Sequence, residues 1–526
     1  MIDKIIDLAL RNRLLTIALA FLVVGWGVIS FNNLPIDAFP DPTPPQVQVF
    51  TLVPGFAPED VEKLVSFPIE AAMNGLPDVE EVRSMSKFGL SVITVIFKRG
   101  TDWYFGRQLV FEQLQQVAEE LPDVAEPGMG PITTGLGRVV QYLVKAPPEM
   151  SVLEVRALQD WLIGMQLKTV PGVNEVISFG GKEKQYQVLI DPNALLKYNL
   201  SIPDVVDAIQ ANNSNKGGQF IELDSGEEAL VTGLGWVKTT DDIAKIIIKA
   251  LDGTPIYIRD VAEVRIGAAI RRGAITYTDD DGKSWGEVVT GVAMKLVNTN
   301  TKKVTNMLRE KIRQLNETLP EGVSIEPWYD QMFMVDRALG TVQRALLEGG
   351  VLVVLVLVFF LYNLRTSFIV ALSIPLSVLI GFIMMDRFGL SANLMSLGGL
   401  AIGIGMMVDG SIVIVENIFR HLTEKKRPQE HLTHVIAVAA KEEARPVVFA
   451  IGIIIIVFIP LVTLKGVEGV MFAPMAFTIG FAMLGSLVVA LTIAPILCSL
   501  MLRGNVIEKA NPLFEWIKSR YLAALR

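Results

Sequence analysis

The sequence has 526 residues, 51% of them hydrophobic and 19% charged, against about 25% charged in an ordinary soluble domain. The net charge is −13 over residues 35–340, +1 over 1–34 and +4 over 341–526. An acidic, polar block therefore lies between two apolar segments, which excludes a wholly soluble protein, a disordered chain and a nucleic-acid-binding protein. A single cysteine, Cys498, excludes a disulfide framework and a multi-cysteine metal cluster.

The first apolar segment, Leu14–Phe31, carries no charge over 18 residues and follows Lys4, Arg11 and Arg13. That length is about the minimum for a membrane-spanning helix. A cleaved signal peptide is the alternative, but its apolar core is usually ~7–15 residues long and is followed by an Ala-x-Ala site, which is missing here. We therefore expect residues 1–34 to form a cytoplasmic N-terminus and an uncleaved first transmembrane helix.

Residues 35–340 alternate strand-like and helix-like runs. The order is a strand, a helix, two strands and a helix, which is typical of a ferredoxin-like split βαβ unit. The expected elements are strands at Gln46–Val53, Val79–Ser84 and Leu90–Phe97, a helix near Pro58–Asn74, and a helix over Trp103–Glu120 capped by Asp102.

Part of this pattern recurs 94 residues later, where the sequence VPGVNEV (170–176) resembles LPDVEEV (76–82). Each motif follows an expected helix and precedes a β-rich run, Leu90–Phe97 in the first case and Gln185–Ile190 in the second. The repeat predicts two related subdomains. Extra material lies between Asp191 and Ala268, and its polar run Asn212–Gly218 predicts a protruding loop.

Five further apolar segments suit spanning helices, which gives six in all: Ala345–Leu364, Thr366–Met385, Leu397–Val415, Pro446–Leu464 and Met475–Leu500. The basic residues of the short loops place 35–340 outside and 420–445 inside. The inner segment holds all three histidines, His421, His431 and His434, which we interpret as surface residues rather than a metal site. Spans two to six occupy residues 341–505, and 506–526 is expected to form an amphipathic interfacial helix.

Two carboxylates lie in one of these spans, Asp409 at its middle and Glu416 near its inner end. A charged carboxylate at bilayer depth costs roughly 2.5–3.5 kcal/mol on insertion scales. Spacing of seven residues places both on one helical face. A structural hydrogen bond is the alternative, but intramembrane carboxylates are functional by default, so we expect a proton relay at Asp409 and, less clearly, at Glu416.

Glycines and methionines surround the two carboxylates. Gly403, Gly405 and Gly410 suit close helix packing and would let another helix approach Asp409. Methionine sulfur suits soft ions such as Cu(I), although methionine is more often apolar filler. The sequence carries neither a P-loop nor an H-E-x-x-H motif, so it gives no support to ATP-driven transport or zinc hydrolysis, and we expect no enzyme activity.

The whole layout resembles the resistance–nodulation–division (RND) efflux transporters, most of all their heavy-metal efflux branch. The resemblance is carried by LPIDAFPDPTPPQVQV (34–49), FKRGTDWYFGRQLV (97–110), LQDWLIGMQLKTVPGVNEV (158–176) and ANLMSLGGLAIGIGMMVDGSIVIVEN (392–417). It implies a trimeric proton antiporter of the bacterial inner membrane that works with a periplasmic adaptor and an outer-membrane channel. Residues 35–340 would be periplasmic porter subdomains with a docking insertion at about 181–272. Asp409 and Glu416 match the membrane aspartate and the glutamate of the family's Val-Glu-Asn motif.

Two departures from the family pattern stand out. Family pumps usually have two such halves and twelve spans, so this chain resembles the N-terminal half only. It would be a fragment, a truncated reading frame or a half-transporter that needs a partner, and the basic partner of the relay would lie in the absent half. Gly403 stands where zinc/cobalt-type pumps carry an extra aspartate, which weakens a divalent-metal interpretation.

The identity of the cargo stays open at this point. Met395, Met407 and Met483 match membrane methionines of the copper/silver type, but the first and last also occur in relatives with other substrates. We expect proton-driven efflux with no cofactor and with a metal ion as cargo. The alternatives are a drug or amphiphile exporter of the same superfamily, and a non-transporting membrane-anchored assembly or protein-handling factor.

Overall fold

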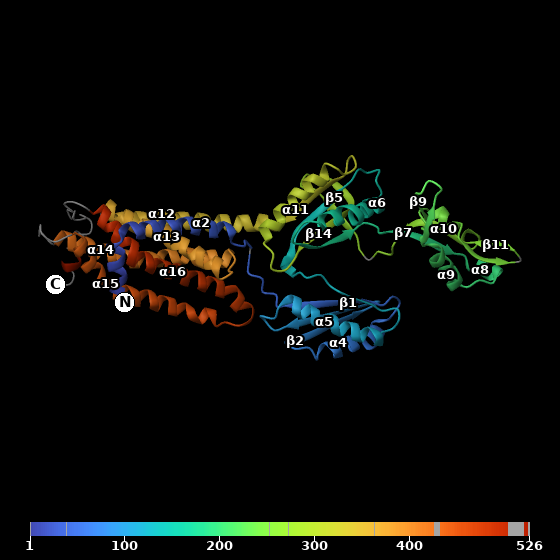
Figure 1. Cartoon of the computed structure of the whole chain (residues 1–526), viewed down its shortest axis with the longest axis horizontal. Helices are drawn as coiled ribbons and strands as arrows, with labels where there is room; N and C mark the ends of the chain where they lie inside the picture. The colour runs from blue at the N-terminus through green and yellow to red at the C-terminus, as the bar shows by residue number, and fades with distance from the viewer. Residues whose placement is uncertain are drawn as a thin grey trace.

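The computed structural model describes residues 2–37, 39–251, 253–271, 273–361, 363–424, 432–502 and 520–523. It is elongated, with a helical bundle at one end, two sheet-containing units in the middle and a third, smaller unit at the far end (Figure 1). The bundle contains both the beginning of the chain and its last third, so the intervening residues form one extramembrane block.

The first sheet unit has the predicted ferredoxin-like order. Its sheet runs β2-β3-β1-β4 with antiparallel neighbours. Asp102 caps α5, as predicted, by accepting hydrogen bonds from the backbone N–H groups of Tyr104 and Phe105 at 2.9 Å. The elements are β1 (Gln46–Leu52), α3 (Pro58–Val61), η1 (Glu62–Ser66), α4 (Phe67–Met73), β2 (Val79–Lys87), β3 (Leu90–Phe97), α5 (Trp103–Val117), η2 (Ala118–Glu120) and β4 (Glu126–Met129).

The second unit repeats this topology. Its strands lie in the order β6-β14-β5-β15, which is the order of β2-β3-β1-β4 when each strand is matched by position. The predicted repeat is therefore confirmed. The elements are η3 (Gly135–Gly137), β5 (Arg138–Lys145), α6 (Val152–Leu158), η4 (Gln159–Ile163), α7 (Gly164–Lys168), β6 (Val173–Gly180), β13 (Ile275–Thr278), β14 (Ser284–Lys295), α11 (Thr301–Asn316) and β15 (Ser324–Asp330).

The repeated sequence motif forms the same turn in both units. Asp78 in LPDV and Gly172 in VPGV occupy the same position, and both have a positive φ, 58° and 88° respectively. The preceding helix of each unit also contains one π-helical turn, η1 and η4. A buried polar residue lies in each: Ser66 contacts Ser91, and Gln159 contacts Tyr142. The two units share the positive-φ turn, the π-helical turn and the strand order, which together indicate an internal duplication.

The predicted β-rich run Gln185–Ile190 is confirmed as a strand, but it does not correspond to Leu90–Phe97 of the first unit. Gln185–Ile190 is not the third strand of the second unit but part of β7 (Lys184–Ile190), which pairs with β12 (Ala262–Ala268). The third strand is β14, about a hundred residues later. A long insertion separates the second and third strands, and β7 has the same strand-forming composition as the strand that it was matched to. Local pattern therefore could not distinguish them.

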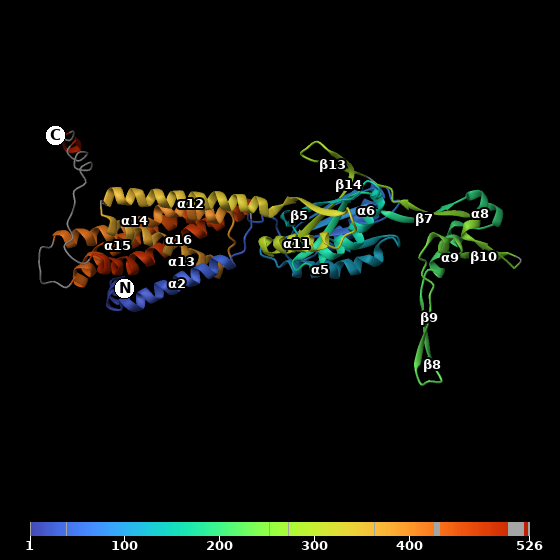
Figure 2. The same ribbon diagram turned by 90° about the horizontal axis from the view of Figure 1, so that it is seen from above.

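The strands β7 and β12 lead to the small distal unit, which has its own apolar core around Val205, Ile258 and Val261. The predicted loop at Asn212–Gly218 is instead the end of α9, a short connection and the start of a hairpin. That hairpin, β8–β9, projects sideways from the molecule (Figure 2). The elements are α8 (Pro192–Tyr198), α9 (Ile202–Asn212), β8 (Lys216–Glu222), β9 (Glu228–Gly233), α10 (Thr240–Ala244), β10 (Ile247–Leu251), β11 (Thr254–Tyr257) and η5 (Ile258–Asp260).

Five helices of the bundle are long and apolar enough to cross a membrane. The sixth expected span falls in α12, whose apolar part among the described residues is the shorter stretch Leu347–Phe359. The bundle consists of α1 (Ile2–Arg11), α2 (Arg13–Asn33), α12 (Gln331–Leu361), α13 (Leu364–Arg387), α14 (Leu394–Glu424), α15 (Leu432–Val462) and α16 (Gly466–Met501). Of the expected interfacial helix at 506–526, all but the helical residues 520–523 lie outside the described residues.

The expected inner loop 420–445 is largely helical. Helix α14 continues to Glu424 and α15 begins at Leu432, so only 425–431 separate them, and these lie outside the described residues. Hydropathy marks only the apolar part of a helix, whereas Lys, Glu and Arg are good helix formers that extend it beyond the apolar run. His421 and His434 are thus helical residues; His431 is outside the described residues.

Candidate functional site

Helix α14 packs against α12, α13, α15 and α16. Its buried face includes Leu400, Met407, Val408, Ile414 and Ile418, which recur at helical spacing. The apolar periodicity of the sequence thus produces a helix with one face held by the bundle, and the orientation of its opposite face is fixed by that packing.

The opposite face of α14 is open. Its half-buried or exposed members recur every three or four residues, so they form one line along the helix. We call them the open stripe: Gly398, Ile402, Gly405, Asp409, Val413 and Glu416. Ile402 in this line is 56% exposed. An exposed line of apolar residues and glycines that also carries two carboxylates indicates a surface that another helix or chain covers.

Asp409 and Glu416 both project from the open stripe, about 10 Å apart along the axis of the helix. Within the described residues, neither carboxylate has a hydrogen bond or an ion pair. The predicted shared face is therefore present. The two carboxylates are separate groups, and no cation among the described residues forms an ion pair with either of them.

The glycines of this helix have different environments. Around Gly405 no atom lies within 4 Å of the position that a Cβ would take, so this glycine leaves room on the open stripe. Gly403 has only the tip of Met407 at 4.0 Å. At Gly410, a Cβ would lie 3.1 Å from Val447 and 3.2 Å from Ile451, so Gly410 lets α15 come close on the buried side.

A polar network joins the inner ends of α14 and α15, next to Glu416. The amide of the buried Asn417 donates to the Ala439 carbonyl at 3.0 Å and to Glu442 at 3.2 Å, and its oxygen accepts from Arg420 at 2.8 Å. His421 lies 3.0 Å from the same Glu442 carboxylate. Sequence reasoning missed this network, although the asparagine of Val-Glu-Asn pointed to it. It fixes the rotation of α14 and hence the direction of the stripe.

Replacing Asn417 with alanine should therefore destabilise the bundle. The change removes both hydrogen bonds that join Asn417 to α15 and leaves the Arg420 guanidinium without its acceptor, at a cost of roughly 1–3 kcal/mol. We expect a lower midpoint of thermal unfolding in detergent. Glu416→Gln at the neighbouring exposed position is the matched control and should leave the midpoint unchanged. Equal midpoints for both variants and the wild type would contradict a structural role for the network.

The three methionines matched by the resemblance occupy different places. Met407 and Met483 are fully buried in the apolar core of the bundle, whereas Met395 is half-buried in the first turn of α14. Across the part of the chain that the structure describes, three or more His, Cys, Asp or Glu side chains do not gather where they could hold a metal ion. Met407 and Met483 thus pack as apolar side chains in this half of the bundle.

A cavity of about 590 Å³ lies where the bundle meets the two sheet units. Asp37 and Asp41, from the segment after α2, line it. Asp37 accepts a hydrogen bond from Thr301 at 2.5 Å and lies 3.7 Å from the Lys295 ammonium, while Asp41 accepts one from Thr134. Both carboxylates thus have partners within the chain. Their contacts tie this segment to the second sheet unit and to the connection just before it, which links α2 to the extramembrane block.

Comparison with known proteins identifies the family and the fold of this chain. The sequence matches the model of the AcrB/AcrD/AcrF family over residues 5–526. The chain belongs to this family. Its RND fold is shared with a crystal structure of a heavy metal efflux pump, with a TM-score of 0.83 and 34% identity over 94% of this chain and 48% of the other.

Several curated relatives within the family are efflux proteins for metal cations by name. The cobalt-zinc-cadmium resistance protein CzcA of Cupriavidus metallidurans is 44% identical over 99% of this chain, and the cation efflux system protein CusA of Escherichia coli is 39% identical over 98%. The chain spans about half the length of each relative. The predicted resemblance to RND transporters of the heavy-metal branch is confirmed.

Proposed function

We propose that this chain is one half, in sequence terms the N-terminal half, of a proton-driven exporter of metal cations. The observation that carries the proposal is the open stripe of α14, on which Asp409 and Glu416 have no partner in the described residues. An unpaired carboxylate at bilayer depth is costly and is rarely retained without a function. A second half that covers the stripe and supplies a cation would turn Asp409 into a group that binds and releases a proton.

The relatives support a metal cation as the cargo, since both CzcA and CusA are named for cation resistance or efflux. These names favour a metal over the drug or amphiphile alternative. The described residues bring together no group of three or more His, Cys, Asp or Glu side chains that would select an ion. We further propose that Gly403, Gly405 and Gly410 allow the helices around Asp409 to pack closely, and that Met395, Met407 and Met483 are candidate contacts for a monovalent ion.

The assembly that follows from this proposal is a trimer in the bacterial inner membrane, joined to a periplasmic adaptor and an outer-membrane channel. Residues 35–340 would be the porter block in the periplasm, and the distal unit, about 181–272, would be the docking subdomain. The charge asymmetry of the short loops supports this orientation.

Transport assays in proteoliposomes test the proposed coupling. The chain and its second half are reconstituted together, a pH gradient is imposed, and uptake of Zn²⁺, Co²⁺ or Cu⁺ is followed with an internal dye. Export coupled to protons predicts that flux of at least one ion rises with the gradient and collapses with a protonophore. Equal flux with and without a gradient would exclude proton coupling.

The proposed topology predicts opposite accessibility for two introduced cysteines. In a Cys498→Ser background, Ser225→Cys at the exposed tip of the β8–β9 hairpin should react with a membrane-impermeant maleimide added to spheroplasts. Lys426→Cys, between α14 and α15, should react only after the membrane is opened. The reverse pattern would place the extramembrane block on the other side.

A further inference from the structure

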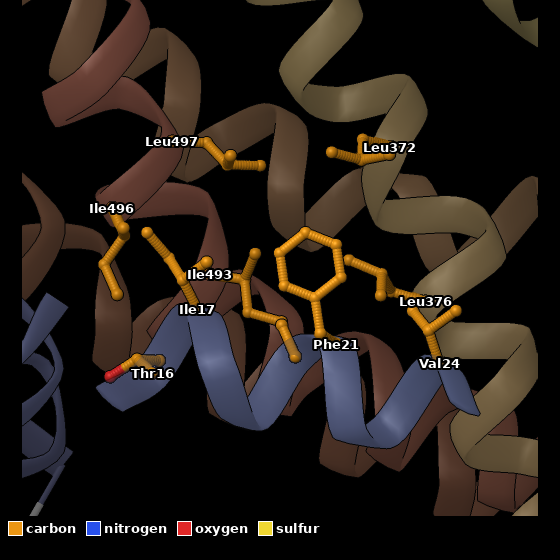
Figure 3. Close-up of a pocket in the computed structure, with 10 residues that line it drawn as sticks. Thr16, Ile17, Phe21, Val24, Leu372, Leu376, Ile493, Ile496 and Leu497 are labelled. Atoms are coloured by element: carbon orange, nitrogen blue, oxygen red, sulfur yellow. The ribbon is translucent and has the colours of Figure 1, made fainter. Parts of the chain in front are cut away.

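An apolar cavity of about 160 Å³ lies inside the membrane part of the bundle, between α2, α13 and α16 (Figure 3). Ile17 and Phe21 of α2 point toward Leu372 of α13 and Ile493 of α16 across it. Every lining side chain but one is apolar. The exception is Thr16, whose hydroxyl donates to the Asn12 carbonyl of its own helix at 3.2 Å. The cavity therefore offers no polar group to a ligand along most of its length.

The cavity exists because α2 and α13 are close at one end and separate at the other. A Cβ on Gly27 would lie 2.7 Å from the Leu379 Cβ, so the two helices nearly touch there. The rings of Phe31 and Phe382 also pack there, with centroids 4.8 Å apart. Toward the start of α2, small Ala20 leaves a gap that neighbouring side chains do not fill. Phe21 lines the gap and is 73% exposed, so the gap opens to the membrane.

The Thr16 end of the cavity lies near two basic residues. Arg13 begins α2, one turn before Thr16, and Arg11 ends the preceding helix α1. Within the described residues neither arginine forms an ion pair, and the nearby Asp7 carboxylate is already paired with Lys441 at 2.6 Å. The Arg13 Nε–H donates to the Leu10 carbonyl at 3.2 Å, which leaves the charge of this group uncompensated. An apolar slot with two such guanidinium groups near one end matches a molecule with a hydrocarbon tail and an anionic head.

We propose that this cavity is a binding site for one anionic phospholipid, with an acyl chain between α2, α13 and α16 and the phosphate at Arg11 and Arg13. An unfilled gap would deprive its lining of dispersion contacts, and the hydrocarbon tails that surround a spanning helix are the apolar groups at hand. Basic residues at a membrane surface favour anionic headgroups. The proposed topology places this lipid in the inner leaflet; the site itself does not depend on the proposed transport.

The site explains how α2 can be held although only Gly27 and Ser30 of this helix are buried. A lipid chain would act as filler between helices that lack side chains to reach one another. Because α2 leads directly to Asp37 and Asp41 at the base of the extramembrane block, the lipid would steady the link between membrane and block.

Native mass spectrometry of the full chain tests this proposal, after delipidation and incubation with phosphatidylglycerol or phosphatidylcholine. We expect one retained phosphatidylglycerol per chain and weaker retention of phosphatidylcholine. Ala20→Phe, which fills the gap, should lower retention about ten-fold, since burial of a few methylenes accounts for such a factor. Ala18→Phe, on the exposed side of α2, is the matched control and should bind as the wild type does.

A double variant, Arg11→Gln with Arg13→Gln, provides a second readout that does not alter the packing of the bundle. It should retain a lipid but lose the preference for phosphatidylglycerol. Equal retention by Ala20→Phe and Ala18→Phe would overturn the tail site, and equal retention of both lipids by the wild type would overturn the headgroup site. If Ala20→Phe instead abolishes a dimer without changing the bound lipid, the occupant is a second copy of the chain and the proposal fails.

Discussion

Asp409→Asn is expected to abolish proton-coupled export while leaving the fold intact. Asparagine has the shape of aspartate but cannot release a proton, so a relay that runs through this position stops. Loss of a group that transfers protons typically costs roughly 10²–10⁴-fold in rate, and we expect flux at background. The fold should survive because the Asp409 side chain is exposed in this half and makes no hydrogen bond in the described structure.

Flux under an imposed pH gradient, measured with the second half present, checks this expectation, and the amount of protein in the membrane is the control for folding. Glu416→Gln is the matched comparison on the same stripe. It should reduce flux less, because Glu416 lies near the end of the apolar run, where water can carry the proton in place of the carboxylate. Wild-type flux from the Asp409→Asn variant would remove Asp409 from the mechanism. A larger loss of flux in Glu416→Gln than in Asp409→Asn would make Glu416 the more important carboxylate.

The sequence was sufficient to predict elements whose signal is local. Strand β3 begins and ends where alternation predicts, at Leu90 and Phe97, and Asp102 caps α5 as its position indicates. The two sheet units were recognisable because their shared turn needs a residue that tolerates positive φ, and Asp78 and Gly172 supply it. Such features depend on neighbours in the chain.

Features that depend on distant residues could not be predicted in this way. The pairing of β7 with β12 is decided across more than 70 residues, so the local sequence could not show which strand β7 pairs with. The rotation of α14 depends on Asn417, which finds its acceptors on α15. Periodicity placed Asp409 and Glu416 on one face, but only the packing of the bundle decides that this face is the open one.

We expect the 526-residue chain alone to confer no metal resistance. Its open stripe would leave Asp409 in the bilayer without a cation, and an ionised carboxylate there costs several kcal/mol. Without a partner to stabilise the charged form, the group cannot alternate between its two forms. The extramembrane block is incomplete in a similar way, since Phe67 and Trp161, on the helices of the two sheet units, are 66% and 73% exposed. Large exposed apolar side chains of this kind mark surfaces that another chain covers.

Growth of a metal-sensitive host on graded metal concentrations measures this requirement, with the chain expressed alone and together with a second half. Gly405→Leu sharpens the test, because no described side chain or neighbouring helix lies within 4 Å of its Cβ position and the variant should fold. It should abolish the resistance gained from the second half by blocking the open stripe. Gly452→Leu, an equally uncrowded glycine on α15, is the matched control and should keep that resistance. Full resistance from the chain alone would require a pump built from copies of this chain, in which a second copy covers the stripe.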